Sequence, residues 1–394
     1  MAGLYIHIPF CKSRCIYCGF YSTTNMALRQ RYVDAVCKEI VLRGARSEVR
    51  SEVRDERLET IYLGGGTPSQ LTVEQLKQLF QTIDKVYGME QVKEVTIECN
   101  PDDVTEEYAA ALPQLGINRV SMGVQTFDNQ RLHFLRRRHT AEQIPIAIQR
   151  LRNAGFHNIS IDLMYGFPGE TLDDWQLDIE AALTLNVEHL SAYCLMVEEG
   201  TVLYEKMRKA KGGMRNEEGE IRNGQSETND DKAEELERQM YELLIDSLTA
   251  AGYEHYEISN FARPGFRSRH NSSYWQDVPY IGIGAAAHSY NGHRRSWNVS
   301  DISQYMSGIE NGQPAFESEM LDDDTRYNDR ITVALRTCEG LRLDELSEQQ
   351  RNYLLCSARR YVDDGLLQLT DTHIRLTRRG LFVSDMVMSD LMLV

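Results

Sequence analysis

The chain has 394 residues, more than one average domain and enough for a large domain with a smaller appendage. Its content of 42% hydrophobic and 26% charged residues is that of an ordinary globular protein, which excludes fibrous and low-complexity classes. The formal net charge of -16 argues against nucleic acid as a partner, because a polyanion is repelled by an acidic surface.

The first residues, MAGLYIHIPF, contain no basic stretch followed by a long apolar run, and no run of about 20 apolar residues occurs anywhere. We therefore expect a cytoplasmic protein with at most peripheral membrane contact. The chain has eight cysteines, which in a protein of this length and expected location should be thiols rather than disulfides. Three of them, Cys11, Cys15 and Cys18, are clustered, and the others are scattered.

Short β-branched or aromatic runs alternate with helical patterns through the first half of the chain. This alternation is typical of strand-helix units around a parallel sheet. The six predicted strands are residues 4–8, 60–63, 94–98, 119–124, 159–164 and 189–195. Between the second and third, residues 73–87 carry apolar side chains at the spacing of one helix face. We predict an α/β fold in which residues 1–205 form a partial (β/α)6 barrel of the TIM type.

The second half of the chain is predicted to have three parts. Residues 206–235 are rich in charge, Gly and Asn and indicate a flexible polar loop. Residues 236–321 are a mixed segment that completes the core. Residues 322–394 contain helical patterns at 330–336 and 349–363, then a hairpin turning at Asp371 and Thr372, which together indicate a small winged-helix-like domain. On so acidic a chain we expect this domain to pack against the barrel rather than to bind DNA.

The sequence CKSRCIYC follows the first predicted strand and has the spacing C-x3-C-x2-C. Thiolates of this kind favour zinc, Cu(I) or an iron-sulfur cluster, and zinc sites usually take four ligands. Three thiolates on a four-iron cube would leave one iron open for a second molecule. The spacing resembles the cysteine loop of the radical S-adenosylmethionine (SAM) superfamily, which has a partial barrel of six units. The resemblance implies a 4Fe-4S cluster whose open iron binds SAM, and an electron donor that reduces the cluster.

Other conspicuous residues lie at the carboxyl ends of the predicted strands, where the active face of such a barrel lies. The turn GGGTP follows the second strand, Glu98 ends the third, Gln125 ends the fourth, and Asp162 lies in the fifth. Polar side chains at equivalent levels of several strands indicate a shared ligand. The resemblance implies SAM contacts by nine residues: Tyr5, Tyr17, Gly65, Gly66, Thr67, Glu98, Gln125, Arg137 and Asp162.

Within the superfamily, the segments YIHIPFC, YLGGGTPS, GVQTF, IDLMYGFPGET and YEISNFA resemble the group of oxygen-independent coproporphyrinogen III oxidases, and most closely its haem chaperone branch, the HemW type. The oxidases carry a fourth cysteine two positions after the third, where this chain has Phe20. They also have a longer extension before the cluster, whereas ten residues precede Cys11 here.

The segment RHNSSYW also favours the chaperone branch, because it reproduces an HNxxYW motif associated there with haem. The resemblance implies haem binding by His270, Asn271, Tyr274 and Trp275. Imidazole is a good axial ligand of haem iron, and aromatic side chains pack on the macrocycle. His288 lies near this region of the sequence as a possible second ligand or SAM-packing residue, and the sequence does not decide its role.

The sequence therefore predicts a radical SAM-type haem chaperone that binds haem, a 4Fe-4S cluster and SAM and passes haem to acceptor proteins. One alternative is an enzyme, a coproporphyrinogen III oxidase that decarboxylates its substrate to protoporphyrinogen IX. A second alternative is a metal-stabilised binding module without SAM chemistry. Whether SAM is cleaved, which protein accepts the haem, and the oligomeric state are left open by the sequence.

Overall fold

The computed structural model describes residues 2–45, 58–212 and 227–393. Six parallel strands lie side by side in chain order, each at the position that the sequence predicts. These strands are β1 (Ala2–Ile8), β2 (Leu58–Gly65), β3 (Glu94–Cys99), β4 (Arg119–Gln125), β5 (Ile159–Tyr165) and β6 (His189–Cys194). The α/β fold with a partial barrel is confirmed.

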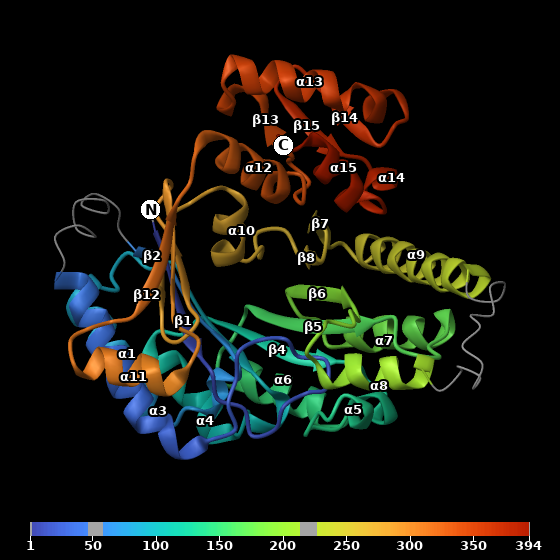
Figure 1. Ribbon diagram of the computed structural model, residues 1–394. Helices are drawn as coiled ribbons and strands as arrows, with labels where there is room; N and C mark the ends of the chain where they lie inside the picture. The colour runs from blue at the N-terminus through green and yellow to red at the C-terminus, as the bar shows by residue number, and fades with distance from the viewer. Residues whose placement is uncertain (1, 46–57, 213–226, 394) are drawn as a thin grey trace.

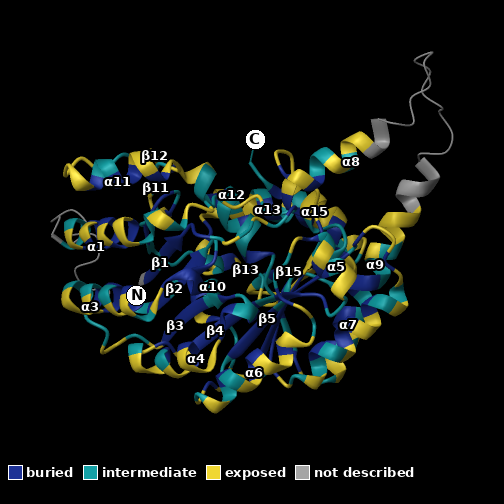
Figure 2. Cartoon of the chain, turned by 90° about the horizontal axis from the view of Figure 1, so that it is seen from below, coloured by how far each residue is buried: buried dark blue, intermediate teal, exposed yellow. Residues whose placement is uncertain are grey.

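Helices cover the outer face of this curved sheet (Figures 1 and 2). They are α1 (Arg29–Ala45), α3 (Val73–Tyr87), α4 (Glu106–Ala111), α5 (Asn129–Phe134), α6 (Gln143–Asn153) and α7 (Leu172–Thr184). Helix α3 has the predicted bounds because Thr72 caps its first turn, accepting from the backbone N–H of Gln75, whose side chain accepts from Thr72 in return.

Alternation along the strands separates an apolar layer from a polar interior. In β1, Leu4, Ile6 and Ile8 are fully buried in the main hydrophobic core, and the intervening Tyr5 and His7 point to the opposite face. Because the sheet curves, that second face becomes the interior of the partial barrel. The polar residues that interrupt the predicted strands therefore face one another across this interior.

The sheet continues beyond the six predicted strands to twelve strands in the described part of the chain. At the β6 edge lie β8 (Asn260–Ala262) and β7 (Glu254–Glu257). At the β1 edge lie β9 (Tyr280–Ile283), β10 (His288–Tyr290), β11 (Arg294–Asn298) and β12 (Phe316–Met320), with helix α11 (Ile302–Glu310) between the last two. The sequence did not predict these strands, because most are short and some, such as β12, are exposed along their whole length.

The predicted polar loop 206–235 is wrong at both ends. Helix α8 (Val202–Gly212) contains the first residues of the predicted loop, and helix α9 (Glu227–Ala250) contains its last residues. Residues 213–226 of that prediction lie outside the described residues. A helix that faces solvent can be built largely from charged residues, so the charged composition of this segment did not distinguish a helix from a loop.

Residues from 322 onward form a separate small core of their own around Ile331, Leu354, Ile374 and Leu391. Its elements are α12 (Asp323–Ala334), β13 (Leu341–Arg342), α13 (Glu348–Asp363), β14 (Leu367–Leu369), β15 (His373–Leu376), α14 (Arg378–Leu381) and α15 (Ser384–Leu391). The three strands form an antiparallel sheet that includes the expected hairpin.

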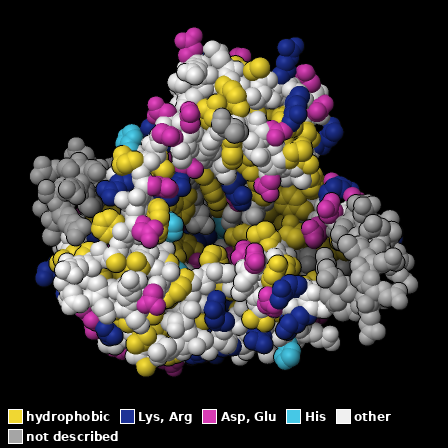
Figure 3. Space-filling model, in the orientation of Figure 1, with side chains coloured by type: hydrophobic (Ala, Val, Ile, Leu, Met, Phe, Trp, Pro, Cys, Tyr) yellow, Lys and Arg dark blue, Asp and Glu magenta, His cyan; other side chains and the backbone are white. Residues whose placement is uncertain are grey.

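Between the sheet and this C-terminal region, the face seen in Figure 3 is hollowed, and hydrophobic side chains gather on its wall. We call this space the hollow. Helix α10 (Arg269–Trp275) lies between the sheet and the C-terminal helices (Figure 1). No helix in the described ranges is both long and apolar enough to span a bilayer.

Candidate functional site

One cavity opens at the carboxyl ends of the parallel strands, next to the loop that follows β1. The three clustered cysteines and eight of the nine predicted SAM contacts line it. The lining residues from these two sets are Cys11, Cys15, Tyr17, Cys18, Gly65, Gly66, Thr67, Glu98, Gln125, Arg137 and Asp162. Residues from five strands and their loops therefore meet in one place, as expected for the active face of a barrel.

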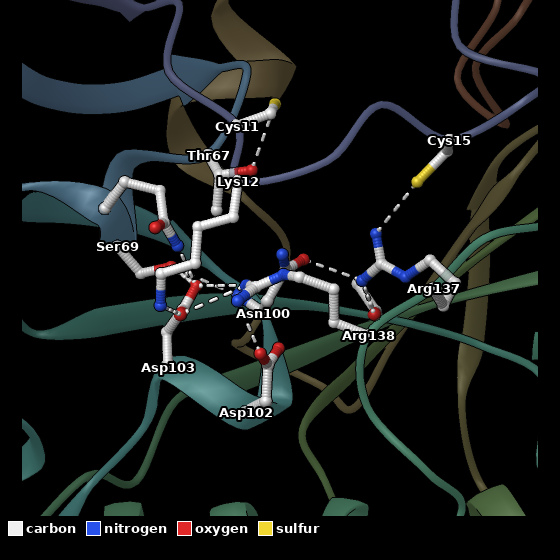
Figure 4. Close-up of polar contacts among 12 residues, drawn as sticks. Cys11, Lys12, Cys15, Thr67, Ser69, Asn100, Asp102, Asp103, Arg137 and Arg138 are labelled. Carbon is white, nitrogen blue, oxygen red and sulfur yellow. Dashed lines mark hydrogen bonds and ion pairs between the residues drawn. The ribbon is translucent and has the colours of Figure 1, made fainter. Parts of the chain in front are cut away.

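The cysteine loop is held against its neighbours by its own sulfur atoms (Figure 4). The Sγ of Cys11 lies 3.3 Å from Oγ1 of Thr67, and the Sγ of Cys15 accepts a hydrogen bond from Nη1 of Arg137 at 3.7 Å. Burial raises the pKa of the Cys11 and Cys18 thiols, and the neighbouring thiols raise it further. Iron binding would have to displace these protons, since the thiolate is the ligand form.

The separation of the donor atoms bears on the kind of metal centre. In the described part of the chain, no group of three or more His, Cys, Asp or Glu side chains lies close enough to hold one metal ion. Three free thiols lining one cavity match the protein ligands of a four-iron cube, in which each of three thiolates binds a different iron.

The glycine turn after β2 brings its backbone directly against the cysteine loop. The N–H of Gly66 donates to the carbonyl of Ile8 at 2.9 Å, and a Cβ at Gly66 would stand 2.7 Å from the carbonyl carbon of Pro9. Gly65 has a φ of +113°, a conformation that L side chains rarely adopt. Only glycine fits both positions.

Two partly buried carboxyl groups line the cavity, those of Glu98 and Asp162. Glu98 accepts from the hydroxyl of Tyr62 at 2.8 Å and from the N–H of Gly65 at 3.2 Å. Burial raises the pKa of Glu98 to about 7 and that of Asp162 to about 6. The Arg119 guanidinium, one level deeper on β4, opposes both shifts. Acceptor groups poised near neutral pH suit hydroxyl and ammonium groups of a ligand.

Hydrogen bonds hold the guanidinium of Arg137 in place, but one of its nitrogen atoms has no partner among the described residues. Its Nη2 donates to Oδ1 of Asn100 at 2.7 Å and to the carbonyl of Gly123, while its buried Nε has no partner among the described residues. Gln125 has a φ of 72°, which is unusual for a residue other than glycine. An unpartnered donor and a strained backbone at one cavity are typical of a ligand site.

Sequence reasoning missed a brace behind the cysteine loop. Asp103 is buried and pairs with Lys12, at 3.1 Å, and with Arg138, at 3.0 Å, so it ties the cysteine loop to the segment after β4. Asn100 directly follows the third strand, and Asp103 ends the short 3-10 helix after it. Polar residues at that position were the signal that could have identified them.

Tyr5, the ninth predicted SAM contact, is not part of the cavity wall. Its hydroxyl lies 3.2 Å from Nδ1 of His7, and its ring stacks on Tyr62 at 6.2 Å between centroids. Tyr5 therefore lies deeper in the barrel interior, behind Glu98.

The four predicted haem-binding residues all belong to helix α10, at the opposite, amino ends of the strands. His270 is 1% exposed, and both ring nitrogens are hydrogen bonded: Nδ1 to the hydroxyl of Thr60 at 2.8 Å and Nε2 to that of Tyr274 at 2.9 Å. Burial lowers the pKa of His270 to about 3. Its imidazole thus holds α10 to β2, and neither nitrogen is available to iron in this arrangement.

The other members of the motif are less enclosed. Asn271, Tyr274 and Trp275 are partly buried, and Trp275 packs edge-on against Tyr256 with ring centroids 5.9 Å apart. The carboxylate of Glu94, the first residue of β3, accepts from the backbone N–H groups of Arg269 and His270 at 3.0 and 2.9 Å. Helix α10 is therefore anchored at its first turn, with its last turn more accessible.

Comparison with known proteins places this architecture in a family. Residues 5–182 match the radical SAM superfamily, and residues 321–383 match the HemN C-terminal domain. The chain is 33% identical to the heme chaperone HemW of Bacillus subtilis over 98% of both chains. It belongs to the HemW family of radical SAM proteins. The heme chaperone HemW of Lactococcus lactis is 34% identical, over 93% of this chain and 88% of that one.

The family also has a solved structural relative. The fold matches that of coproporphyrinogen III oxidase (HemN) from Escherichia coli, described as a radical SAM enzyme, with a TM-score of 0.79 and 22% identity over 99% of this chain and 89% of that one. At that identity the likeness shows the fold. It accounts for the joint presence of the partial barrel and the small C-terminal domain.

Proposed function

We propose that this protein is a haem chaperone that carries a 4Fe-4S cluster and SAM and passes haem to an acceptor protein. The observation that carries the proposal is the meeting of three thiols with the glycine turn, Glu98, Asp162 and Arg137 in one cavity. The family membership supports the haem cargo, because the curated relatives bear the name heme chaperone.

In this proposal Cys11, Cys15 and Cys18 would hold three irons and leave the fourth for SAM. A bound cluster, reduced by an external electron donor, would supply the electron for any cleavage of the SAM sulfonium. The polar side chains of the cavity then bind and orient SAM: Tyr17, Thr67, Glu98, Gln125, Arg137 and Asp162, together with the backbone of Gly65 and Gly66.

Haem is a large, flat and mostly apolar ligand, and exposed apolar side chains beside the cysteine cavity offer a matching surface. Phe20 and Met196, 71% and 67% exposed, lie on the cysteine loop and on the loop after β6, and these loops touch through Gly19 and Glu198. We call Phe20, Tyr193, Met196 and Val197 the apolar rim. Exposed aromatic and methionine side chains beside a cavity are typical of a binding surface.

Phe20 also distinguishes the chaperone from the oxidase. It lines the cavity at the position where the oxidases are expected to carry a fourth cysteine. An apolar, exposed ring there adds surface for a tetrapyrrole and supplies neither a ligand nor a redox group. The proposal therefore assigns Phe20 to haem contact rather than to chemistry.

The test uses one anaerobically reconstituted sample of the full chain, divided between two assays. In the first, haem is titrated and the Soret band is followed. In the second, coproporphyrinogen is incubated with SAM and a reductant, and the products are separated. We expect saturable haem binding and no protoporphyrinogen. Turnover of coproporphyrinogen would establish the oxidase instead, and absence of haem binding would reject the chaperone.

Phe20→Ala provides a second readout. It should weaken haem binding by about tenfold, because it removes an exposed ring from the apolar rim, and leave the iron and sulfide content unchanged. Leu177→Ala is the matched control, since Leu177 is 64% exposed on α7, outside the apolar rim. Equal effects of the two changes would contradict the assignment of the apolar rim.

A further inference from the structure

The haem proposal leaves the iron without a protein ligand, because both nitrogens of His270 are engaged. A candidate ligand must be an imidazole with a free nitrogen, on a surface that a large planar molecule can reach. All ten histidines lie in the described part of the chain, so each can be examined for these properties.

Six histidines each have at least one ring nitrogen hydrogen bonded to another protein group: His7, His139, His189, His255, His270 and His373. The other four, His133, His157, His288 and His293, have no ring hydrogen bond among the described residues. Of these four, His288 alone has a ring contact with another described aromatic side chain.

His288 stacks on Trp297 with 5.8 Å between ring centroids and 24° between planes. The two residues are direct partners across the antiparallel pair of β10 and β11. His288 is exposed, so the stacking orients the imidazole without covering it. Burial of part of the ring and the nearby Arg295 lower its pKa, which favours the neutral form that binds metal.

The register of the two strands decides which way His288 faces. Tyr290 and Arg295, also a direct pair, lie two residues along on the same face. Tyr290 donates to Asp277, directly beyond α10, and Arg295 pairs with Asp329 on α12. The face that carries His288 is thus turned toward α10 and toward α12 of the C-terminal region, and the hollow lies between that region and the sheet (Figure 3).

The opposite face of these strands is already covered. Arg43 on α1 donates to Ser289 at 3.3 Å and to Asn298 at 3.1 Å, and buried Glu39 accepts from the same Asn298. Helix α1 therefore fixes β10 and β11 from behind, and the strands hold His288 and Trp297 on a rigid support. A preorganised ligand loses little entropy on binding.

We propose that His288 is the axial ligand of haem iron, with Trp297 packing beside it, and that His270 anchors helix α10 instead. This inference rests on the proposed haem-binding function. It assigns to β10 and β11 a role that the motif in α10 had been expected to fill, and it places the iron in the hollow rather than in the closed interior between α10 and β2.

The experiment is a haem titration of the full chain, with cluster intact, followed by Soret and Q-band absorbance. His288→Ala should weaken haem binding at least about tenfold and remove the spectrum of an imidazole-bound iron. The matched control is His293→Ala, because His293 is an exposed histidine in the turn between the same two strands. It should titrate as the wild type does.

Rescue separates ligation from a structural effect. Added imidazole should restore the spectrum of His288→Gly, whereas folded His270→Gln should keep the imidazole-bound spectrum without added imidazole. If His288→Ala keeps wild-type affinity and spectrum, the inference is overturned, and the haem function stands on the wild-type titration. If the wild type itself binds no haem, the proposed function fails, which is a distinguishable result.

Discussion

At the carboxyl ends of the strands, the predicted SAM contact Arg137 leaves its buried Nε without a partner in the described structure, whereas at the amino ends the predicted haem contact His270 has both ring nitrogens hydrogen bonded. We call these two regions the cluster end and the α10 end. Both carry motifs that the sequence marked as functional. The difference teaches that a motif marks a place in the fold, and that the state of its polar atoms indicates whether a ligand is still needed there.

The largest expected effect separates the two ends outright. Cys15→Ala should abolish assembly of the four-iron cluster, because two thiolates cannot hold three irons. Iron and labile sulfide per chain after anaerobic reconstitution measure this. Cys37→Ala, at a buried cysteine of α1 that does not line the cavity, should leave both values unchanged. Full iron content in Cys15→Ala would show that the cluster end is not a cluster site.

The next effect concerns stability at the α10 end. His270→Ala removes a buried ring stacked on Tyr62 and leaves the hydroxyls of Thr60 and Tyr274 without their partner. We expect a loss of about 3 kcal/mol in the free energy of unfolding. Urea denaturation followed by circular dichroism gives this value, and iron content should not change in the folded protein. A loss below about 1 kcal/mol would mean that the anchoring role is wrong.

A smaller effect concerns the pH dependence of stability that the carboxyl group of Glu98 causes at the cluster end. The pKa of Glu98 is raised from 4.5 to about 7, so the folded state binds its proton more tightly than the unfolded state does. Stability from this group is fully present below pH 4.5 and is lost as the pH rises toward 7. Glu98→Gln has no such loss. Its stability relative to wild type should therefore grow by about 1 kcal/mol between pH 6 and pH 8.

The same variant should bind SAM at least about tenfold more weakly, since a carboxylate acceptor is replaced by an amide. Thermal melts at the two pH values and calorimetric titration with SAM provide the measurements. Glu59→Gln, on a more exposed carboxyl of β2, is the control. A relative stability that stays constant with pH would contradict the raised pKa of Glu98.

The smallest effect belongs to the brace behind the cysteine loop. Lys12 is 53% exposed, so its pair with Asp103 is screened by solvent, and Lys12→Ala should cost at most about 0.5 kcal/mol. Asp103→Ala should cost more, because Arg138 would lose one of its two carboxylate partners and Ser69 its acceptor. Chemical denaturation of both variants measures which of them loses more free energy of unfolding. Equal losses would show that Asp103 does not act as the brace.

The sequence by itself determined the six parallel strands, helix α3 and the residues of the cluster end. Each depends on local information: alternation of side chains, a capping box, and polar residues at strand ends that a parallel sheet must bring to one edge. Cys11, Thr67, Glu98 and Asp162 meet because strand order follows chain order, which the alternating pattern already implied.

Only the tertiary structure decided the rest. The strands at both edges of the sheet are short and are held by neighbours distant in sequence, as β11 is by Glu39 and Arg43 of α1. The fate of His270 and His288 was decided in the same way. Both are histidines among aromatic residues. Only packing shows that Thr60 and Tyr274 hydrogen bond to the ring nitrogens of His270, whereas His288 stacks on Trp297 and its ring nitrogens have no described partner. Hydrogen bonds between distant residues require the folded chain, so no local pattern encodes them.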